Sequence, residues 1–320
     1  MQDIHLTLTP EESIQETIDR IEYGQHARVE LAAGDYTEKV IVDKPYVSIC
    51  GASPSSTKII YSDFANKLHE GDAREYGTFR TFTLCVTAPH VTLENVSIIN
   101  TAGNPAQNGQ SVALSAYGHN LTVSNCVLSS THATLFCGPL PDDLVAAYDS
   151  QLPDILRYYE GESLQVYHKT KIIGSIDSIF GCANAWFDAC AIVSTHDDRD
   201  IGYVSAPAHS LKQKYGFQFL DCHFSHHGCK TRSIYLARPW RDFGKATFIN
   251  ATISDHVHPA LFDSWENSGR EKTARFSYFS VTGAEICPPA WGTALREEEE
   301  TRIRRRYEQV LQALRKSRTM

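Results

Sequence analysis

The stretch GSIDSIFG, residues 174–181, places one carboxylate, Asp177, among apolar neighbours. Burying a lone aspartate is costly unless a cation or several hydrogen-bond donors compensate for its lost hydration. The sequence therefore predicts that Asp177 has a partner elsewhere in the chain, and that the pair is either a structural ion pair or part of a reactive site.

Three other stretches carry groups that could work with this carboxylate. GQSVAL holds Gln110, an amide donor, and THATLF (131–136) holds His132, an imidazole that can donate and accept protons near neutral pH. YLARPW holds Arg238, a guanidinium, and Trp240, a flat apolar face. Taken singly, Gln110 reads as a bend residue, Trp240 could be core, and Asp177 with Arg238 could be a buried ion pair without a task. Taken as an ordered set, they favour a site.

Two other clusters suggest metal ligands on first inspection. HDDRD (196–200) is acidic enough for Ca²⁺, but a solvated turn explains it more simply. SHHGC (225–229) has no second ligand pair at a useful spacing. We therefore predict neither a metal site nor a cofactor.

The elements that must position these residues form a repeat of about 30 residues. Each copy has an apolar run, then Asn or Asp, then apolar alternation rich in Val, Ile, Phe and Thr, which is typical of strands. The copies are VTLENVSIIN (91–100), LTVSNCVLSS (121–130), AWFDACAIVS (185–194), FQFLDCHFSH (217–226) and ATFINATISD (246–255). The polar positions are separated by 30, 63, 33 and 29 residues, so the long gap spans two periods.

Repeats of this length indicate stacked units that cannot bury their apolar faces alone. We predict an all-β fold, a right-handed parallel β-helix with Asn or Asp at its bends. A propeller would need four strands in each unit of roughly 40–50 residues, which the shorter spacing disfavours.

Two segments have helical periodicity. Residues 9–24 place Ile14, Ile18 and Ile21 on one face, with Thr9 as the expected N-cap, and would cap the first coil. Residues 296–316 predict a helix along the C-terminal flank. The least regular part, 137–163, is a long excursion of the kind that often carries binding function. We expect one domain over residues 1–320.

The four stretches, in this order and on this repeat, resemble the pectin methylesterase (pectinesterase) family of carbohydrate esterases. That family carries QAVAL-like, QDTL, DFIFG and GRPW stretches on a right-handed parallel β-helix. GDYTEKV (34–40), GYVSAPA (202–208) and SWENSGREKTARF (264–276) are further echoes, so the resemblance spans nearly the whole chain.

The resemblance implies hydrolysis of methyl esters of homogalacturonan or its oligomers, through an acyl-enzyme and with release of methanol. It assigns Asp177 as nucleophile, Gln110 as oxyanion donor, Arg238 as the residue that pairs with and aims Asp177, and Trp240 as a sugar contact. Phe180 is a further aromatic platform.

One departure stands out. Where the family's QDTL stretch has its second oxyanion donor and its general acid and base, this chain has His132 and Ala133. An alanine cannot move a proton. Either a neighbour replaces the acid, or the protein binds uronate-rich glycans without turning them over. His132 is the first candidate for the acid, and the others are Asp142, Asp143, Asp149, Glu160 and Glu162.

Other β-helix activities fit less well. A polygalacturonase needs paired aspartates to activate water, and the four stretches supply a single one. A pectate lyase usually needs a Ca²⁺ site built from several carboxylates.

Composition narrows the partners. The 320 residues have a net charge of -8 and no long basic tract, so nucleic acid and membranes are poor partner predictions. A local groove would have to override this charge to hold a polyanionic pectin or oligogalacturonide.

The nine cysteines form no CxxC pair and predict reduced, buried thiols. The start lacks a secretory leader, which predicts a cytoplasmic protein, or a secreted one if a leader was removed. The sequence does not predict the oligomeric state.

Overall fold

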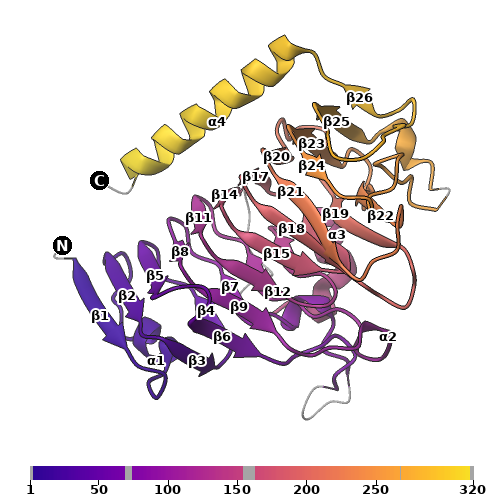
Figure 1. Cartoon of the computed structure of the whole chain (residues 1–320). Helices are drawn as coiled ribbons and strands as arrows, with labels where there is room; N and C mark the ends of the chain where they lie inside the picture. The colour runs from indigo at the N-terminus through magenta and orange to yellow at the C-terminus, as the bar shows by residue number, and fades with distance from the viewer. Residues whose placement is uncertain (1–2, 69–73, 154–162, 267, 318–320) are drawn as a thin grey trace.

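The chain folds as a right-handed parallel β-helix, as the repeat predicts (Figure 1). The computed structural model describes residues 3–68, 74–153, 163–266 and 268–317. Three sheets, here called A, B and C, run along the coil stack, and strands in neighbouring coils pair in parallel.

Within the described residues, sheet A has eleven strands: β1 (Ile4–Leu8), β2 (Ala27–Leu31), β5 (Val47–Gly51), β8 (Thr92–Glu94), β11 (Leu121–Ser124), β14 (Leu164–His168), β17 (Asn184–Asp188), β20 (Phe217–Leu220), β23 (Lys245–Ile249), β25 (Arg275–Phe279) and β26 (Thr293–Ala294). Sheet B has eight: β3 (Gly34–Thr37), β6 (Thr57–Tyr61), β9 (Ser97–Asn100), β12 (Val127–Ser129), β15 (Lys171–Gly174), β18 (Ala191–Thr195), β21 (His223–His227) and β24 (Thr252–Ile253). Sheet C has seven: β4 (Val40–Val42), β7 (Leu84–Val86), β10 (Leu114–Ala116), β13 (Leu135–Cys137), β16 (Ile176–Gly181), β19 (Gly202–Pro207) and β22 (Ile234–Ala237).

Four of the five repeated Asn and Asp positions lie at the bends between sheets A and B, whereas Asp188 is the last residue of β17 and Ala189, with φ of 50°, forms the bend of that coil. Asn95, Asn125, Asp221 and Asn250 have φ between 48° and 55°, a left-handed conformation that Asn and Asp adopt more readily than most residues. The Asn125 side-chain amide donates to Asn95 at 2.7 Å, so the bends are linked from coil to coil. The long gap in the repeat holds strands β14 and β15, which form the missing coil.

Aromatic rings stack through the core at the spacing of the coils. Tyr167, Phe187, Phe219 and Phe248 occupy equivalent positions on sheet A, and their successive ring centroids are 4.8, 4.6 and 4.7 Å apart. These distances match the separation of paired strands, so each ring packs directly on the ring of the preceding coil. The stack fixes the register of the coils that carry the site.

The N-terminal end of the stack is covered by α1 (Ile14–Asp19), which is shorter than the predicted 9–24. Ser13, rather than Thr9, is the N-cap, and its side chain accepts from the Glu16 N–H. The Glu38 carboxylate also accepts backbone N–H groups of the first turn, at 2.7 Å and 3.1 Å, a favourable place for an anion. Tertiary contacts therefore place the helix start at Ile14.

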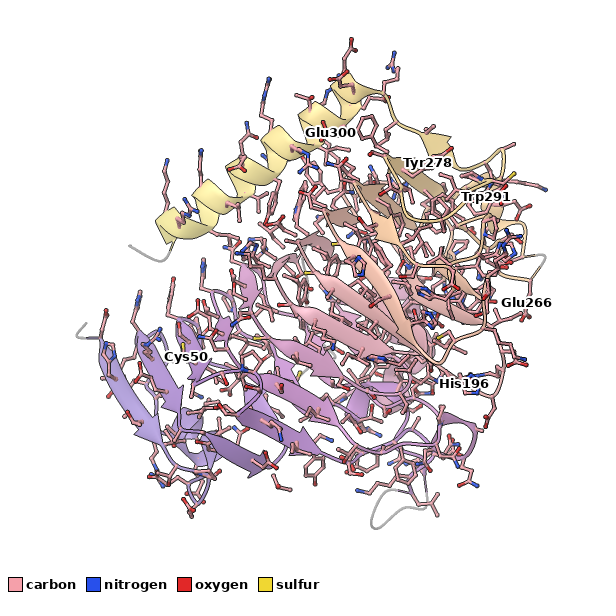
Figure 2. All side chains as sticks on the ribbon, in the orientation of Figure 1. Cys50, His196, Glu266, Tyr278, Trp291 and Glu300 are labelled. Carbon is pink, nitrogen blue, oxygen red and sulfur yellow. The ribbon has the colours of Figure 1, made fainter. Side chains whose placement is uncertain are left out.

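The C-terminal coils are closed by aromatic packing and by a long helix. Trp291 packs on Phe262 and Phe276, with centroids 5.9 and 5.7 Å apart, and lies at the end of the stack (Figure 2). Helix α4 (Glu297–Ser317) then runs back along the flank of sheet A, as predicted (Figure 1). Its buried residues Tyr307, Val310 and Leu314 cover Val166, Trp186, Leu220 and Ile249.

Short helical elements complete the chain. They are η1 (Thr78–Arg80), α2 (Pro105–Asn108), α3 (Asp142–Tyr148), η2 (Asp149–Gln151) and η4 (Arg270–Lys272). Leu144 of α3 is fully buried in an apolar cluster on the outer face of sheet C, so this part of the 137–163 excursion packs against the sheet. Among the described residues, no helix combines the length and apolar character needed to cross a bilayer.

Candidate active site

A pocket of about 530 Å³ opens on the outer face of sheet C. It brings together every residue that the sequence predicts for the site: Gln110, His132, Asp177, Phe180, Arg238 and Trp240. Ala133 lines it as well. These residues come from four coils within a run of five, those of β10, β13, β16 and β22, so stacking joins positions that are far apart in the sequence.

Asp177 lies on β16 at a local irregularity of the strand. The pairing of β16 with β19 shifts register between Ile176 and Ile179, and Asp177 has φ of 48°. Such a bulge re-aims one side chain relative to its neighbours. The flanking residues Ile176 and Ser178 are buried, whereas the Asp177 carboxylate reaches the pocket.

Arg238 is the partner that Asp177 needs. Its Nε donates to Oδ1 at 2.9 Å and its Nη2 donates to Oδ2 at 2.6 Å, a two-pronged ion pair with both side chains about 85% buried. The guanidinium lies between two rings, 3.7 Å from the Tyr203 centroid and 3.9 Å from that of Trp265. Cation–π contact on both faces fixes its orientation, so Asp177 is paired and aimed.

His132 and Ala133 lie beside Asp177 because they belong to the neighbouring coil. The Ala133 N–H donates to the Ile176 carbonyl at 3.0 Å, and Ala133 has φ of 62°. The His132 side chain is 8% exposed, and its Nδ1 has no hydrogen-bond partner among the described residues. Burial lowers the pKa of His132 to about 4, although Asp177 opposes that change. The imidazole is therefore neutral near pH 7.

Protein stability should fall as the pH is lowered from about 6.5 toward 4. Burial also lowers the pKa of His209 to about 3 and that of His256 to about 4, so all three imidazoles bind protons more readily in the unfolded chain. The stability they contribute is complete above pH 6.5, and at pH 5 its loss amounts to about 2 kcal/mol for each histidine. Urea denaturation at pH 7 and pH 5 measures this loss, and equal stability at both would contradict it.

The alternative acids that the sequence suggests do not line the pocket, insofar as they belong to the described residues. Asp142, Asp143 and Asp149 are absent from its lining. Glu160 and Glu162 lie outside the described residues. Asp177 and the exposed Glu266 are the carboxylates that line the pocket among the described residues, and Glu266 lies at the outer edge of the molecule (Figure 2).

Several lining residues were missed by the sequence analysis. Tyr148 of α3 contacts Trp240 and Phe79, with ring centroids 6.2 and 5.2 Å away. Tyr203 and Trp265 fall within GYVSAPA and SWENSGREKTARF, which were noted only as echoes of the family. The irregular sequence of residues 137–163 indicates that this segment carries function, but it does not single out Tyr148. Nothing in the local sequence points to Phe79.

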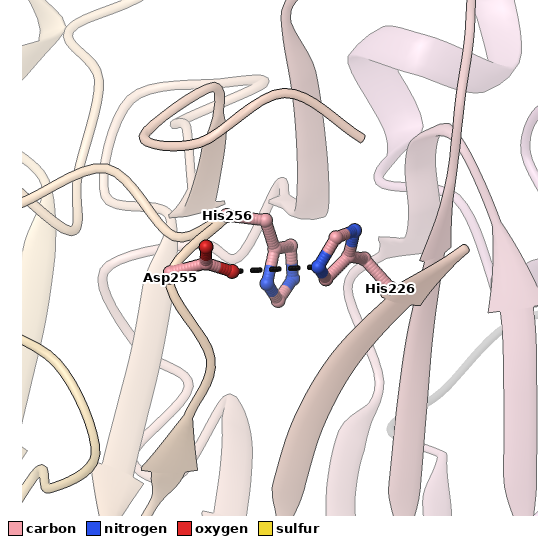
Figure 3. A group of neighbouring side chains, drawn as sticks. All are labelled: His226, Asp255 and His256. Carbon is pink, nitrogen blue, oxygen red and sulfur yellow. Dashed lines mark ion pairs between the residues drawn. The ribbon is translucent and has the colours of Figure 1, made fainter. Parts of the chain in front are cut away.

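A second cluster, away from the pocket, contains His226, Asp255 and His256 (Figure 3). The His226 Nε2 lies 3.4 Å from the Asp255 carboxylate. The two rings are stacked, with centroids 4.7 Å and planes 23° apart. Imidazole lone pairs lie in the ring plane, so nearly parallel stacked rings do not converge on one ion. The arrangement fits a stack between neighbouring coils, and the absence of a metal remains a prediction.

The pattern of the Pectinesterase family matches residues 9–139 and 153–287 and leaves out 140–152, where α3 lies. Pectinesterase QRT1 of Arabidopsis thaliana is 28% identical over 287 residues, 85% of this chain. This chain spans 66% of the length of QRT1, and 41% and 45% of two proteins from the same plant that are named probable pectinesterase/pectinesterase inhibitor 23 and 35.

Solved structures share the fold. A pectin methylesterase from Yersinia enterocolitica has a TM-score of 0.76 and 22% identity, over 90% of this chain and 95% of that one. A pectin methylesterase in complex with a hexasaccharide has a TM-score of 0.75 and 19% identity, over 91% of this chain and 90% of that one. At these identities the likeness establishes the architecture alone.

Proposed function

Because the chain belongs to the pectinesterase family, we propose that it hydrolyses methyl esters of homogalacturonan, or of oligomers derived from it, to the free acid and methanol. The observation that carries this proposal is the paired Asp177 carboxylate in a pocket lined by aromatic side chains. A fixed carboxylate supplies a nucleophile, and flat apolar faces suit sugar rings.

In the first half-reaction an Asp177 oxygen attacks the ester carbonyl carbon. The tetrahedral intermediate collapses, the bond to the methoxy oxygen breaks, and methanol leaves after gaining a proton. The product is an acyl-enzyme in which Asp177 is an anhydride. Arg238 keeps Asp177 ionised and oriented before attack, because both carboxylate oxygens are bonded to one rigid guanidinium.

Charge on the carbonyl oxygen needs donors that are already in place. Gln110 offers a side-chain amide in the pocket, and its own backbone carbonyl accepts from Ala65 at 2.9 Å, which anchors its position. His132 offers an N–H from a neutral ring. Its lowered pKa makes it a better hydrogen-bond donor to an oxyanion than a source of protons at neutral pH.

The proton for methanol then comes from water, since Ala133 supplies none. That water becomes hydroxide, and in the second half-reaction the hydroxide attacks the acyl carbonyl. The anhydride bond breaks, Asp177 is regenerated, and the uronate leaves as the free acid. The scheme balances with the ester and one water as reactants, and the missing acid makes it slower than a reaction with a positioned carboxyl group.

Trp240 and Phe180 have different places in sugar binding. Trp240 is half-buried and touches Phe180 and Tyr148, so one part of its ring remains available. Phe180 is only 6% exposed and forms the floor under it. The hexasaccharide complex of a structural neighbour supports an oligosaccharide ligand for this pocket.

The test is methanol release from methyl-esterified oligogalacturonides by the purified chain. We expect one methanol for each new carboxylate, measured together by gas chromatography and titration. The same oligomers after saponification, and acetyl-esterified ones, serve as controls and should release no methanol. Tight binding of the methylated oligomers without methanol over hours would instead support a glycan-binding protein that has lost the reaction.

A further inference from the structure

A network of hydroxyl side chains runs behind the pocket, between the strands of sheet B and those of sheet C. Its members are Ser111, Ser130, Thr131 and Ser175. They come from the three consecutive coils that carry β10, β13 and β16, and the three serines are buried. Each of these coils also supplies a pocket residue close to a member of the network: Gln110, His132 and Asp177. The network thus links the backbone segments from which the three pocket side chains project.

Ser111 and Ser130 are joined by two hydrogen bonds. Their hydroxyl oxygens are 2.7 Å apart, and the Ser130 hydroxyl also donates to the Ser111 carbonyl. A hydroxyl has a single proton to donate, so the Ser111 hydroxyl is the donor in the bond between the two side chains. The Ser111 N–H in turn donates to the His132 carbonyl at 3.0 Å. Ser111 therefore ties the coil of Gln110 to the coil of His132 through its side chain, its carbonyl and its N–H.

The network continues to the strand that carries Asp177. The Thr131 hydroxyl lies 3.3 Å from that of Ser111. The Thr131 carbonyl accepts both the N–H of Ser175, at 2.9 Å, and the Ser175 hydroxyl. The same hydroxyl is 3.2 Å from the Asp197 carboxylate. Because Ser175 is two residues before Asp177, the segments that hold the other two pocket residues are also fixed relative to the carboxylate.

Ser111 and His132 are both departures from the family's stretches, and they are in contact. Ser111 stands where the QAVAL-like stretch has Ala, and His132 stands where the QDTL stretch has Gln. An alanine side chain forms no hydrogen bond, so the link to Ser130 depends on the serine. A histidine ring also has fewer rotatable bonds than a glutamine side chain. The place of its N–H therefore depends more closely on the backbone that carries it.

We propose that Ser111 is a positioning residue, which sets the separation of the Gln110 amide and the His132 N–H so that both reach one oxyanion. This inference rests on the proposed function. A donor stabilises the oxyanion only if it already lies within hydrogen-bond distance of the oxygen on which charge develops. The ester carbonyl of the bound substrate carries less charge than the oxyanion. Loss of Ser111 should therefore lower kcat more than it changes KM.

The test is Ser111→Ala, assayed by methanol release from methyl-esterified oligogalacturonides. We expect kcat to fall about 10-fold, less than for removal of a whole oxyanion donor, with KM nearly unchanged. Ser130→Ala removes the same link from the other side and should reproduce this loss.

Ser97→Ala is the matched control. Ser97 is buried in the same coil as Ser111, and its hydroxyl donates to the Pro54 carbonyl of the preceding coil at 2.5 Å. It does not line the pocket. The control variant thus loses the same kind of bond between coils and should keep the wild-type kcat.

A double-mutant cycle distinguishes positioning from a general loss of stability. In a Gln110→Ala background, Ser111→Ala should lower kcat by less than about 2-fold, because the separation of the two donors no longer matters. A merely structural role predicts instead that the two effects multiply. An unchanged kcat in both Ser111→Ala and Ser130→Ala, or effects that multiply in the cycle, overturns the inference.

A spectroscopic measurement separates this inference from the proposed function. In protein labelled with nitrogen-15 histidine, the ring signals of His132 are identified by their absence from the spectrum of His132→Ala. Ser111→Ala should shift these signals, and Ser97→Ala should not. A shift, in a protein that releases no methanol from any ester, keeps Ser111 as the residue that places the His132 ring and rejects the esterase. Unshifted signals, in a protein that does release methanol, reject the positioning role and keep the esterase.

Discussion

Replacing Asp177 with Asn should abolish methanol release, with kcat lowered by about 10⁴-fold or more, as when the nucleophile of a covalent mechanism is removed. An amide cannot form the acyl-enzyme, yet it has nearly the same shape and still accepts one hydrogen bond from Arg238. Oligosaccharide binding should therefore persist while turnover stops. Methanol release under single-turnover conditions, measured beside calorimetric binding of the methylated oligomer, checks both statements.

Asp143→Asn is the matched control, since it removes the same charge from α3. The Asp143 side chain is 70% exposed and lies outside the pocket, with Arg241 at 3.9 Å as its ion-pair partner. The activity of the Asp143→Asn protein should equal that of the wild type. Asp177→Asn should also lose stability, because Arg238 is left buried without an anion. Full activity in a correctly folded Asp177→Asn protein would remove Asp177 from the mechanism.

Replacing Ala133 with Asp should raise kcat by about 10²-fold or more, the contribution typical of a positioned general acid. Ala133 lines the pocket, and aspartate tolerates the φ of 62° found there better than most residues. The new carboxyl group would be buried close to ionised Asp177. Both conditions raise the pKa of a carboxyl group, so that it holds a proton near neutral pH and can give it to the departing methoxide.

The pH profile distinguishes this mechanism from a general gain in binding. The variant should acquire a new dependence of kcat on pH, with activity falling as the added carboxyl group loses its proton. Ala133→Asn is the control, because it has the same shape but no acidic proton, and should stay near the wild type. If Ala133→Asp gains nothing, another group already protonates methanol, and the proposal that water supplies this proton is wrong.

The sequence predicts the fold well because the β-helix repeats one local rule. Asn95, Asn125, Asp221 and Asn250 mark bends where a left-handed backbone is required, and the apolar alternation around them fills the core. The boundaries of α1 were less predictable. Glu38, far along the chain, bonds to the first turn and selects Ser13 rather than Thr9 as the cap.

The site residues that lie in recognisable motifs were predictable from the sequence. Those that reach the pocket only because the coils stack on one another were not. Asp177 and Arg238 belong to recognisable stretches, and their pairing is a contact across 61 residues that the structure supplies. The local sequence predicts a solvated turn around Arg199, whereas the structure buries Asp197 through a contact with Ser175 in the preceding coil that local sequence does not show. Tyr148 comes from a segment outside the family match, so no motif marks it.

Helix α4 makes contacts between residues far apart in the sequence, which the coils do not make with one another. Neighbouring bends are joined by contacts such as Asn125 to Asn95, 30 residues apart, so each coil needs only the one before it and can be added as the chain is synthesised. By contrast, Arg304 pairs with Asp221 across 83 residues, and the Tyr307 hydroxyl donates to Asp188 across 119. Helix α4 thus holds several coils together, so that coils which otherwise contact only their neighbours form one cooperative unit.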